Sequence, residues 1–521
     1  MISSAPIYRR LLALIAAIVT FGGGALAAQA SADRASSDSA VLVRIRDEGF
    51  HRSQVLQTAL GISDLHGPRL AGSAAYLAAA RWSRDRLIRW GIAQAALEPW
   101  GRHAPVWKLD RFSLEMTTPH YLRVTAMPRV WSPAIHGVAS GAPLLLHAGP
   151  DDDLSRYRGR LRGRIVLLGS AVPAAGRNAA PIRRWTAREL DSLAALPEPG
   201  APHSYAEDVG SYQVVLDRRK RLDRFLASEG VAALLEPSEV DAAVRVDGFW
   251  DFYRRGAHVP SFVVARDHYA RIVRLLEAGR PARLSVSLAA HLERGSATGY
   301  NVVAEIPGTD PTLGPEVVML GGHLDSWHAG TGATDNAAGC AVVMEVLRIL
   351  HAVGARPRRT IRIGLWDGEE PTADYAGSVG YVRRHLGDPT TGRRLPDADR
   401  FDAYFNLDNG TGRIRGIFLQ GDSAARPVLM ALLAPFRDLG AATVSIANTG
   451  ETDHMSFVGA GLPGFQFIQD PVDYESRTHH SNLDVGDYLL EEDLEQAAVV
   501  MAGVAYGAAM LDVKIPRSAA P

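Results

Sequence analysis

Short apolar runs alternate with helical patterns through the C-terminal part of the chain. Patterns typical of buried strands cover Asn301–Ile306, Glu316–Gly321 and Thr360–Trp366, and apolar residues recur at helical spacing over Ala337–Val353 and Glu491–Leu511. Strands that alternate with helices in this way favour a mostly parallel sheet with helices on both faces. The sequence therefore predicts an α/β fold.

The N-terminal part of the chain shows a different pattern. Val41–Gly61 and Ala74–Trp90 have apolar residues at helical spacing. From about Pro128, short β-like runs such as Ile165–Leu168 take over, until the pattern changes again near Ala297. We interpret this middle region as a β-rich module inserted into one α/β domain.

The first residues of the chain have the pattern of an export signal. Arg9 and Arg10 precede the apolar run Leu11–Phe21, and A-x-A sites follow at Ala25–Ala27 and Ala28–Ala30. This combination typifies a cleaved secretory signal peptide, with an uncleaved membrane anchor as the alternative. We expect a secreted or periplasmic protein with no membrane anchor after cleavage. The predicted division is a signal peptide at 1–30, the first part of the main domain at 31–127, the inserted module at 128–295, the rest of the main domain at 296–515 and a tail at 516–521.

Composition narrows the classes of function. Hydrophobic residues make up 47% of the chain and charged residues 22%, as in ordinary soluble proteins. The formal net charge of -1 gives no overall positive field for binding nucleic acid. Cys340 is the single cysteine, which excludes intrachain disulfides and zinc sites built from cysteines.

Side chains suited to chemistry follow three predicted strands. His323 and Asp325 end one of them, Glu369 and Glu370 follow the next, and Asp408 follows an apolar run at Tyr404. The carboxyl ends of parallel strands meet at the edge of the sheet where α/β folds bind ligands. Taken singly, each group has a plainer interpretation, as a polar turn or a solvated acidic loop.

Two further groups complete the pattern. Asp335 stands just before a helix, where it could be only an N-cap, and His479 and His480 lie in a polar loop, where either could be a surface residue. The full order, His-x-Asp, Asp, Glu-Glu, Asp, His, is far more specific than its parts. Oxygen and nitrogen ligands without thiolate suit a pair of zinc ions with a shared water.

The strings around these residues resemble the M28 zinc peptidases, and among them most the plasma glutamate carboxypeptidase (carboxypeptidase Q) group. The inserted module resembles a protease-associated domain. The resemblance covers nearly all of the chain after the signal peptide and implies an exopeptidase with two zinc ions, a peptide substrate and plausibly a homodimer. The matching strings are Gly322–Ser326, Asp335–Gly339, Trp366–Glu370, His480–Ser481 with Asp484, and the early Gly67–Ser73.

The resemblance also implies which side chains bind the metals. Asp335 would bridge both zinc ions. His323 and Asp408 would complete one zinc site, and Glu370 and His480 the other. His480 is preferred to its neighbour because it directly precedes a serine and the downstream aspartate, as the ligand of the family does.

Two more residues receive roles from the resemblance. Glu369 would act as general base and acid, and Asp325 would orient His323. The family often has a cis peptide bond after the bridging aspartate, so Asp335-Asn336 is a candidate for one. The chain departs from the family at Pro371–Asp374, which looks like a small insertion beside the site.

Functions outside the zinc exopeptidases stay open at this point. Ala376–Gly380 has the shape of a serine-hydrolase elbow with Ser378 as nucleophile. The sequence is also compatible with a glutaminyl cyclase that binds one zinc ion, or with a non-catalytic binding protein on the same fold. Within the peptidases, it does not distinguish an aminopeptidase from a carboxypeptidase or a dipeptidase.

Overall fold

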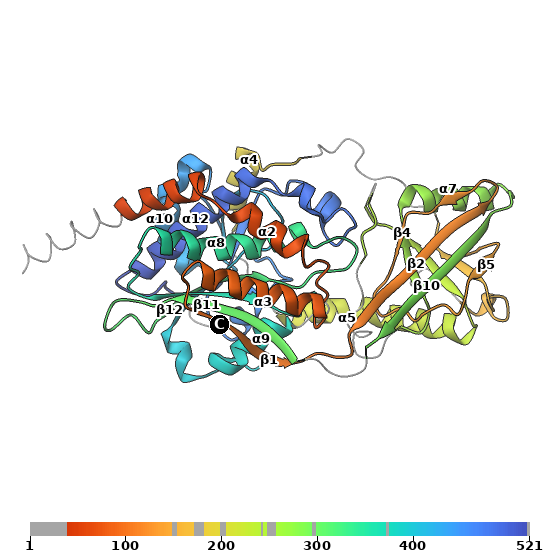
Figure 1. Ribbon diagram of the computed structural model, residues 1–521, viewed down its shortest axis with the longest axis horizontal. Coiled ribbons are helices and arrows are strands. Elements are labelled where there is room, and N and C mark those ends of the chain that lie inside the picture. Colours follow the sequence, from red (N-terminus) through yellow and green to blue (C-terminus); the bar gives the residue numbers. More distant parts are fainter. Residues whose placement is uncertain are drawn as a thin grey trace, which may run out of the picture.

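The computed structural model shows two lobes joined side by side (Figure 1). It describes residues 39–147, 154–170, 182–197, 205–240, 243–246, 257–293, 298–370 and 375–517. The predicted signal peptide at 1–30, the predicted insertion Pro371–Asp374 and the end of the predicted tail lie outside the described residues. Within the described ranges, no helix combines the length and the apolarity needed to cross a bilayer.

The larger lobe is built on one eight-stranded sheet. Its four central strands run parallel, and antiparallel strands flank them on both sides. This arrangement confirms the predicted α/β fold with a mostly parallel sheet. In spatial order the strands are β1 (Gln94–Arg102), β11 (Thr298–Ile306), β13 (Thr360–Trp366), β12 (Val317–His323), β16 (Phe401–Asn406), β19 (Gly464–Gln469), β17 (Ile414–Phe418) and β18 (Thr443–Ser445).

Helices cover both faces of this sheet, which is why its central strands are mostly apolar. In β12, Leu320 packs into the core on one face, whereas Met319 packs with Tyr404 on the other. The first face is covered by a helix over residues 39–51 and by α2 (Val55–Ser63), α3 (Ala74–Arg89), α8 (Ala338–Ala352), α10 (Arg426–Leu433) and α12 (Glu491–Met510). The second face is covered by α9 (Ala376–His385) and α11 (His454–Gly459).

The predicted elements match the observed ones closely, with one exception. The helical pattern over Val41–Gly61 is interrupted, because the chain turns at Ser53 and Gln54 before α2 begins. The Ser53 hydroxyl accepts the Val55 N–H, and the Glu345 carboxylate accepts the Gln54 N–H. These side chains satisfy amides that a continuous helix would have paired within itself.

Among the described residues, the smaller lobe contains two further sheets together with the helices α5 (Tyr205–Ser228) and α7 (Arg266–Glu277) (Figure 1). One sheet comprises β3 (Leu122–Arg123), β2 (Trp107–Thr118), β10 (Arg283–Leu292) and β5 (Ala139–Gly141). The other comprises β4 (Ala126–Pro128), β9 (Ser261–Val264), β8 (Ala233–Pro237), β7 (Ile165–Leu168) and β6 (Leu144–Leu146).

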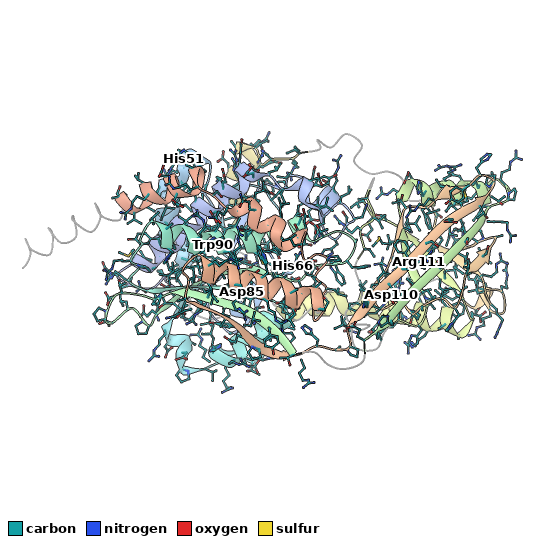
Figure 2. The ribbon with its side chains drawn as sticks, in the orientation of Figure 1. His51, His66, Asp85, Trp90, Asp110 and Arg111 are labelled. Carbon is teal, nitrogen blue, oxygen red and sulfur yellow. The ribbon has the colours of Figure 1, made fainter. Side chains whose placement is uncertain are left out.

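The smaller lobe begins earlier in the chain than the predicted boundary at residue 128. Strand β2 pairs with β10 over its whole length, and Figure 2 shows its Asp110 and Arg111 in the smaller lobe. The partner strand lies far along the chain, so the local pattern did not reveal this pairing. Conversely, α4 (Ala187–Ala194) lies within the predicted module but packs against β18 of the larger lobe, where the Ser445 hydroxyl donates to the Leu193 carbonyl. The likeness of the smaller lobe to a protease-associated domain stays a prediction.

Candidate metal centre

Three candidate ligands meet at the carboxyl ends of neighbouring parallel strands. His323 is the last residue of β12, and Asp408 follows β16, which pairs with β12. The His323 Nε2 atom lies 3.2 Å from Asp335 Oδ1 and 3.2 Å from Asp408 Oδ1. These three side chains, which we call the inner group, are at most 7% exposed. Their ligand atoms are close enough together to bind one metal ion.

A second group forms around the other oxygen of Asp335. The His480 Nε2 atom lies 3.4 Å from Asp335 Oδ2 and 3.0 Å from Glu370 Oε2. Glu370 is placed there by β13, the other parallel neighbour of β12. We call Asp335, Glu370 and His480 the outer group. Asp335 therefore offers one oxygen to each group, as a bridging carboxylate would, while the five ligand roles stay a prediction.

Both histidines of the polar loop reach this centre. His479 Nε2 lies 3.9 Å from Asp335 Oδ2, and Asp335, His479 and His480 also form a cluster that could bind a metal ion. The other ring nitrogen of His479, Nδ1, is 3.4 Å from Glu475 Oε2. His480 contacts two buried carboxylates where His479 contacts one. The geometry therefore favours His480 as the ligand.

The electrostatics of the cluster suit a cation. Asp335 Oδ2 and Glu370 Oε1 are buried and, among the described residues, have no hydrogen-bond partner. Burial, and then the charge of Asp335, raises the pKa of the Glu370 carboxyl well above its usual value. Burial would also raise the pKa of Asp335, but hydrogen bonding from His323 and the nearby histidine charges outweigh burial and lower it. Divalent zinc, which accepts oxygen and nitrogen donors, would compensate these crowded carboxylates.

The turn that carries Asp335 is fixed by its neighbours in sequence. The Asp335-Asn336 peptide bond is cis, as expected from the resemblance. The Asn336 amide donates to the Leu407 carbonyl at 2.9 Å, and its Oδ1 accepts the Gly339 N–H at 2.9 Å. A Cβ atom on Gly339 would lie 2.3 Å from Asn336 Oδ1, so only glycine fits there. These contacts explain why Asn336 and Gly339 occur in the Asp335–Gly339 string.

Asp484, from the last matching string, connects the histidine loop to this turn. Its Oδ1 accepts the Thr334 N–H at 2.5 Å and the Thr334 hydroxyl at 2.9 Å. Its main-chain carbonyl accepts the Thr331 N–H at 2.8 Å. Asp484 therefore fixes Thr334, the residue just before Asp335. Because Asp484 follows His480 closely in the sequence, it also ties the histidine loop to this turn.

Asp325 contacts His323, its predicted partner, and also both glutamates. The His323 Nδ1 atom lies 3.1 Å from the Asp325 carbonyl oxygen but 3.8 Å from its Oδ1. The buried carboxylate accepts the N–H of Glu369 through Oδ1 and that of Glu370 through Oδ2, both at 3.2 Å. Asp325 therefore contacts His323 chiefly through its main chain, and its side chain positions the two glutamates. Burial raises the pKa of Glu369 well above its usual value.

Comparison with known families places this centre in a defined class. The model of peptidase family M28 matches residues 301–505, which include all five candidate ligands and Glu369. Over these residues the chain is similar to peptidase family M28. This finding confirms the resemblance seen in the sequence.

Known proteins with similar sequences include a carboxypeptidase. Carboxypeptidase Q of Mus musculus is 32% identical over 233 residues, which are 44% of this chain and 46% of that protein. Leupeptin-inactivating enzyme 1 of Streptomyces exfoliatus is 32% identical over 170 residues, which are 32% of this chain and 35% of that protein. The chain spans about half the length of the carboxypeptidase Q sequences that it matches.

Solved structures share the fold of this protein. A peptidase M28 precursor from Shewanella amazonensis superposes with a TM-score of 0.69 at 22% identity, covering 93% of this chain and all of that one. A zinc aminopeptidase from Bacillus subtilis gives a TM-score of 0.54 at 18% identity, covering 87% of this chain and 94% of that one. At these identities the likeness establishes the fold alone.

Sequence reasoning gave no role to Arg69, although this residue lies in the matching string Gly67–Ser73. The Arg69 side chain is fully buried and donates to the carbonyls of Leu324 at 2.7 Å, Thr331 at 2.7 Å and Gly332 at 2.8 Å. These carbonyls belong to the segments that carry His323 and Asp335. Arg69 therefore joins the two segments behind the inner group of the M28 domain.

The contact of Thr452 with Asp408 was not predicted either. Its hydroxyl donates to Asp408 Oδ2 at 2.5 Å and accepts the Asn406 amide at 3.0 Å. The Asn406 Oδ1 accepts in turn from the Tyr404 hydroxyl at 2.6 Å. This buried chain leaves Asp408 Oδ1 to face His323. No metal-ligand spacing in the sequence marks Thr452, because its partner is reached only in the folded chain.

The site proposed for a serine hydrolase has a different environment. Ser378 is buried in α9, and its hydroxyl bonds with the Ser456 hydroxyl at 2.8 Å and donates to the Tyr375 carbonyl at 3.2 Å. A serine nucleophile needs a histidine or another base at hydrogen-bond distance. These partners suit a serine that stabilises the packing of α9 against α11.

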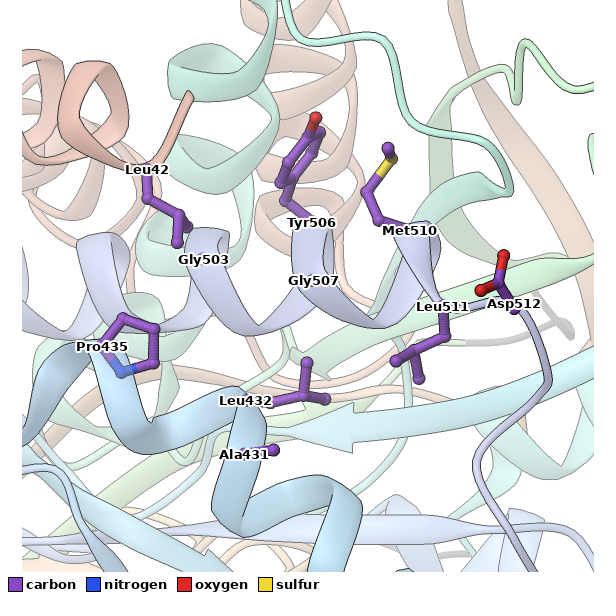
Figure 3. Close-up of a pocket in the computed structure, with 10 residues that line it drawn as sticks. All are labelled: Leu42, Ala431, Leu432, Pro435, Gly503, Tyr506, Gly507, Met510, Leu511 and Asp512. Carbon is purple, nitrogen blue, oxygen red and sulfur yellow. The ribbon is translucent and has the colours of Figure 1, made fainter. Parts of the chain in front are cut away.

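An apolar cavity of about 290 Å³ lies elsewhere in the larger lobe (Figure 3). It opens between α10 and α12 and is lined by residues such as Leu42, Leu432 and Met510. None of the candidate ligands contributes to it. This cavity is therefore separate from the candidate metal centre.

Proposed function

We propose that this protein is an exported exopeptidase that binds two zinc ions and hydrolyses small peptides. The observation that carries the proposal is the convergence of the inner and outer groups on the two oxygens of Asp335, with Glu369 beside them. The names of its relatives, carboxypeptidase Q and zinc aminopeptidase, support a peptide substrate with a free terminus. Export rests on the pattern within residues 1–30.

The reaction divides between the metals and the chain. Bound zinc ions supply Lewis acidity, which activates water and polarises the carbonyl of the scissile bond. Glu369 takes the proton from the attacking water and returns it to the departing amine. The Asp325 carboxylate, which accepts the Glu369 N–H, sets the direction from which this side chain enters the site.

Metal removal distinguishes this function from the competing ones. The purified protein should contain two zinc ions per chain, lose hydrolysis of unblocked dipeptides after chelation and regain it when zinc is added. Activity that resists chelation would instead indicate a serine hydrolase. One zinc ion per chain with cyclisation of N-terminal glutamine would indicate a glutaminyl cyclase, and zinc binding without any turnover would indicate a binding protein. Comparing free and blocked dipeptides identifies which terminus is required.

A single substitution tests the base. Glu369→Gln should keep both zinc ions and lose about 100-fold or more of the turnover, because proton transfer by a positioned side chain contributes on this scale. Glu293→Gln, in the pair with Lys108 of the smaller lobe, is the matched control and should keep both zinc content and activity. Near-normal turnover in Glu369→Gln would remove Glu369 from this role.

A further inference from the structure

We propose that the smaller lobe positions His480, so that binding of the second zinc ion depends on a contact between the lobes. The contact joins residues 243–246 of the smaller lobe, the bridging segment, to residues 475–482, the histidine loop. The inference rests on the proposed two-zinc site. It assigns a role to a part of the chain that lies outside the matched M28 domain.

The bridging segment pairs with the histidine loop as a short antiparallel strand. The Val246 N–H donates to the His480 carbonyl at 2.8 Å. The Val244 N–H donates to Asn482 Oδ1 at 2.6 Å, and the Asn482 N–H returns to the Val244 carbonyl at 3.2 Å. Between these bonds, Arg245 and Ser481 form an antiparallel bridge. These bonds therefore lie on both sides of Ser481 and hold the chain directly after the candidate ligand.

The side chain of Arg245 strengthens this contact. Its Nε donates to the His479 carbonyl at 3.0 Å, and its Nη2 donates to the Glu475 carbonyl. The Arg245 side chain is only 19% exposed, and its bond to the His479 carbonyl is partly buried, whereas the bond to the Glu475 carbonyl is exposed. One guanidinium thus joins both ends of the turn that leads into His480. Because the fork of arginine donors is rigid, it fixes the spacing of the two carbonyls.

The backbone of His480 needs such support. Its φ of 56° lies in the left-handed region, which a residue with a Cβ atom adopts at an energetic cost. Such a conformation persists where the surrounding structure fixes it. The hydrogen bond from Val246 to the His480 carbonyl fixes the peptide on the C-terminal side of this residue.

The bridging segment is itself firmly anchored. Val244 and Val246 are fully buried and pack with Val263 and Ala265 at the end of β9 in the smaller lobe. The position of His480 therefore depends on the core of the smaller lobe as well as on the sheet that carries the inner group.

The test measures zinc binding by the full-length protein. In the wild type we expect two zinc ions per chain, and in Arg245→Ala we expect one to weaken about 10–100-fold, the range for losing a residue that supports a metal ligand. Arg245→Lys should restore part of the affinity. Arg129→Ala is the matched control, because Arg129 is similarly exposed at 17% but pairs with Glu236 inside the smaller lobe. It should bind both ions as the wild type does.

Further measurements separate positioning from general damage. Cobalt substituted for zinc should show a changed visible spectrum in Arg245→Ala and an unchanged one in Arg129→Ala. Asn482→Ala, which removes the acceptor for Val244 from the other side of the contact, should weaken the same zinc ion and gives the answer if Arg245→Ala does not fold. Wild-type affinity for both ions in a folded Arg245→Ala or Asn482→Ala overturns the inference, as does equal weakening of both ions. Failure of the proposed function would appear instead in the wild type, as an absence of zinc or of hydrolysis.

Discussion

The inner and outer groups share Asp335 but differ in what positions them. His323 and Asp408 follow adjacent parallel strands, and their side chains are 2% and 7% exposed. His480 comes from a loop, is 21% exposed and receives a hydrogen bond from Val246 of the smaller lobe. A ligand at a strand end takes its position from one lobe, whereas a loop ligand also depends on the second. The two groups should therefore respond differently to substitution.

The largest effect is expected where the groups overlap. Asp335→Ala removes the carboxylate that faces both histidines, so we expect both zinc ions to be lost. The decrease in affinity should exceed the roughly 100-fold seen when only a supporting residue is removed. Zinc content after gel filtration, measured by atomic emission, checks this. Unchanged zinc content would refute the bridging assignment.

Asp402→Ala is the matched control for this experiment. Asp402 is also fully buried but lies at the opposite end of β16 from Asp408, where its Oδ1 accepts the Ile515 N–H at 2.8 Å. The variant should be less stable and still bind two zinc ions. Loss of metal in both variants would show that zinc content reports general destabilisation.

Substituting each histidine in turn distinguishes the contribution of the outer group from that of the inner group. His480→Ala should leave one zinc ion per chain, because His323, Asp335 and Asp408 stay in place. His323→Ala should retain less than one, since its Nε2 contacts both Asp335 and Asp408 and so orients the shared carboxylate. Zinc titration against a competing chelator distinguishes the variants. If both variants retain the same amount of zinc, the two groups contribute equally to zinc binding, although one histidine lies at a strand end and the other in a loop.

The candidate residues that follow strands could be predicted from the sequence because their positions follow the sheet. The predicted strand Thr360–Trp366 has the same bounds as β13, and Glu369 and Glu370 follow it directly. Buried parallel strands are apolar, so the first polar residues after them mark the edge where ligands gather. The resemblance to the family then supplied Asp335 and His480, which no strand introduces.

The supporting contacts could not be predicted in this way. Arg69 meets Leu324 across 255 positions in sequence, and Arg245 meets His479 across 234. No periodicity or spacing encodes such pairs, since they arise only when the lobes fold and meet. The same limit explains the misplaced boundary at residue 128, because β2 is recognisable as part of the smaller lobe only through β10.

Two buried arginines test whether the inner group depends on Arg69 specifically. Arg69→Met and Arg359→Met should each lower the free energy of unfolding by about 3 kcal/mol, since each leaves buried polar groups unpaired. Arg359, 1% exposed, bonds Glu316 instead of carbonyls beside the ligands. Only Arg69→Met should also weaken zinc binding, by about 10-fold or more. Denaturant unfolding with and without zinc measures both quantities, and equal zinc affinity in the two variants would reduce Arg69 to a general stabiliser.

The smallest effect is expected at Thr452. Thr452→Val keeps the shape of the side chain and removes the hydroxyl that donates to Asp408 Oδ2. Asp408 would then lose one of the contacts that turn its other oxygen toward His323, and the inner zinc ion should bind about 10-fold more weakly. Thr58→Val is the control, because the buried Thr58 hydroxyl donates at 2.7 Å to the Gln54 carbonyl within the helical layer. Weaker zinc binding in Thr452→Val alone would show that the inner zinc site depends on a residue that does not bind the metal. Equal zinc affinity in Thr452→Val and Thr58→Val would show that it depends on its ligands only.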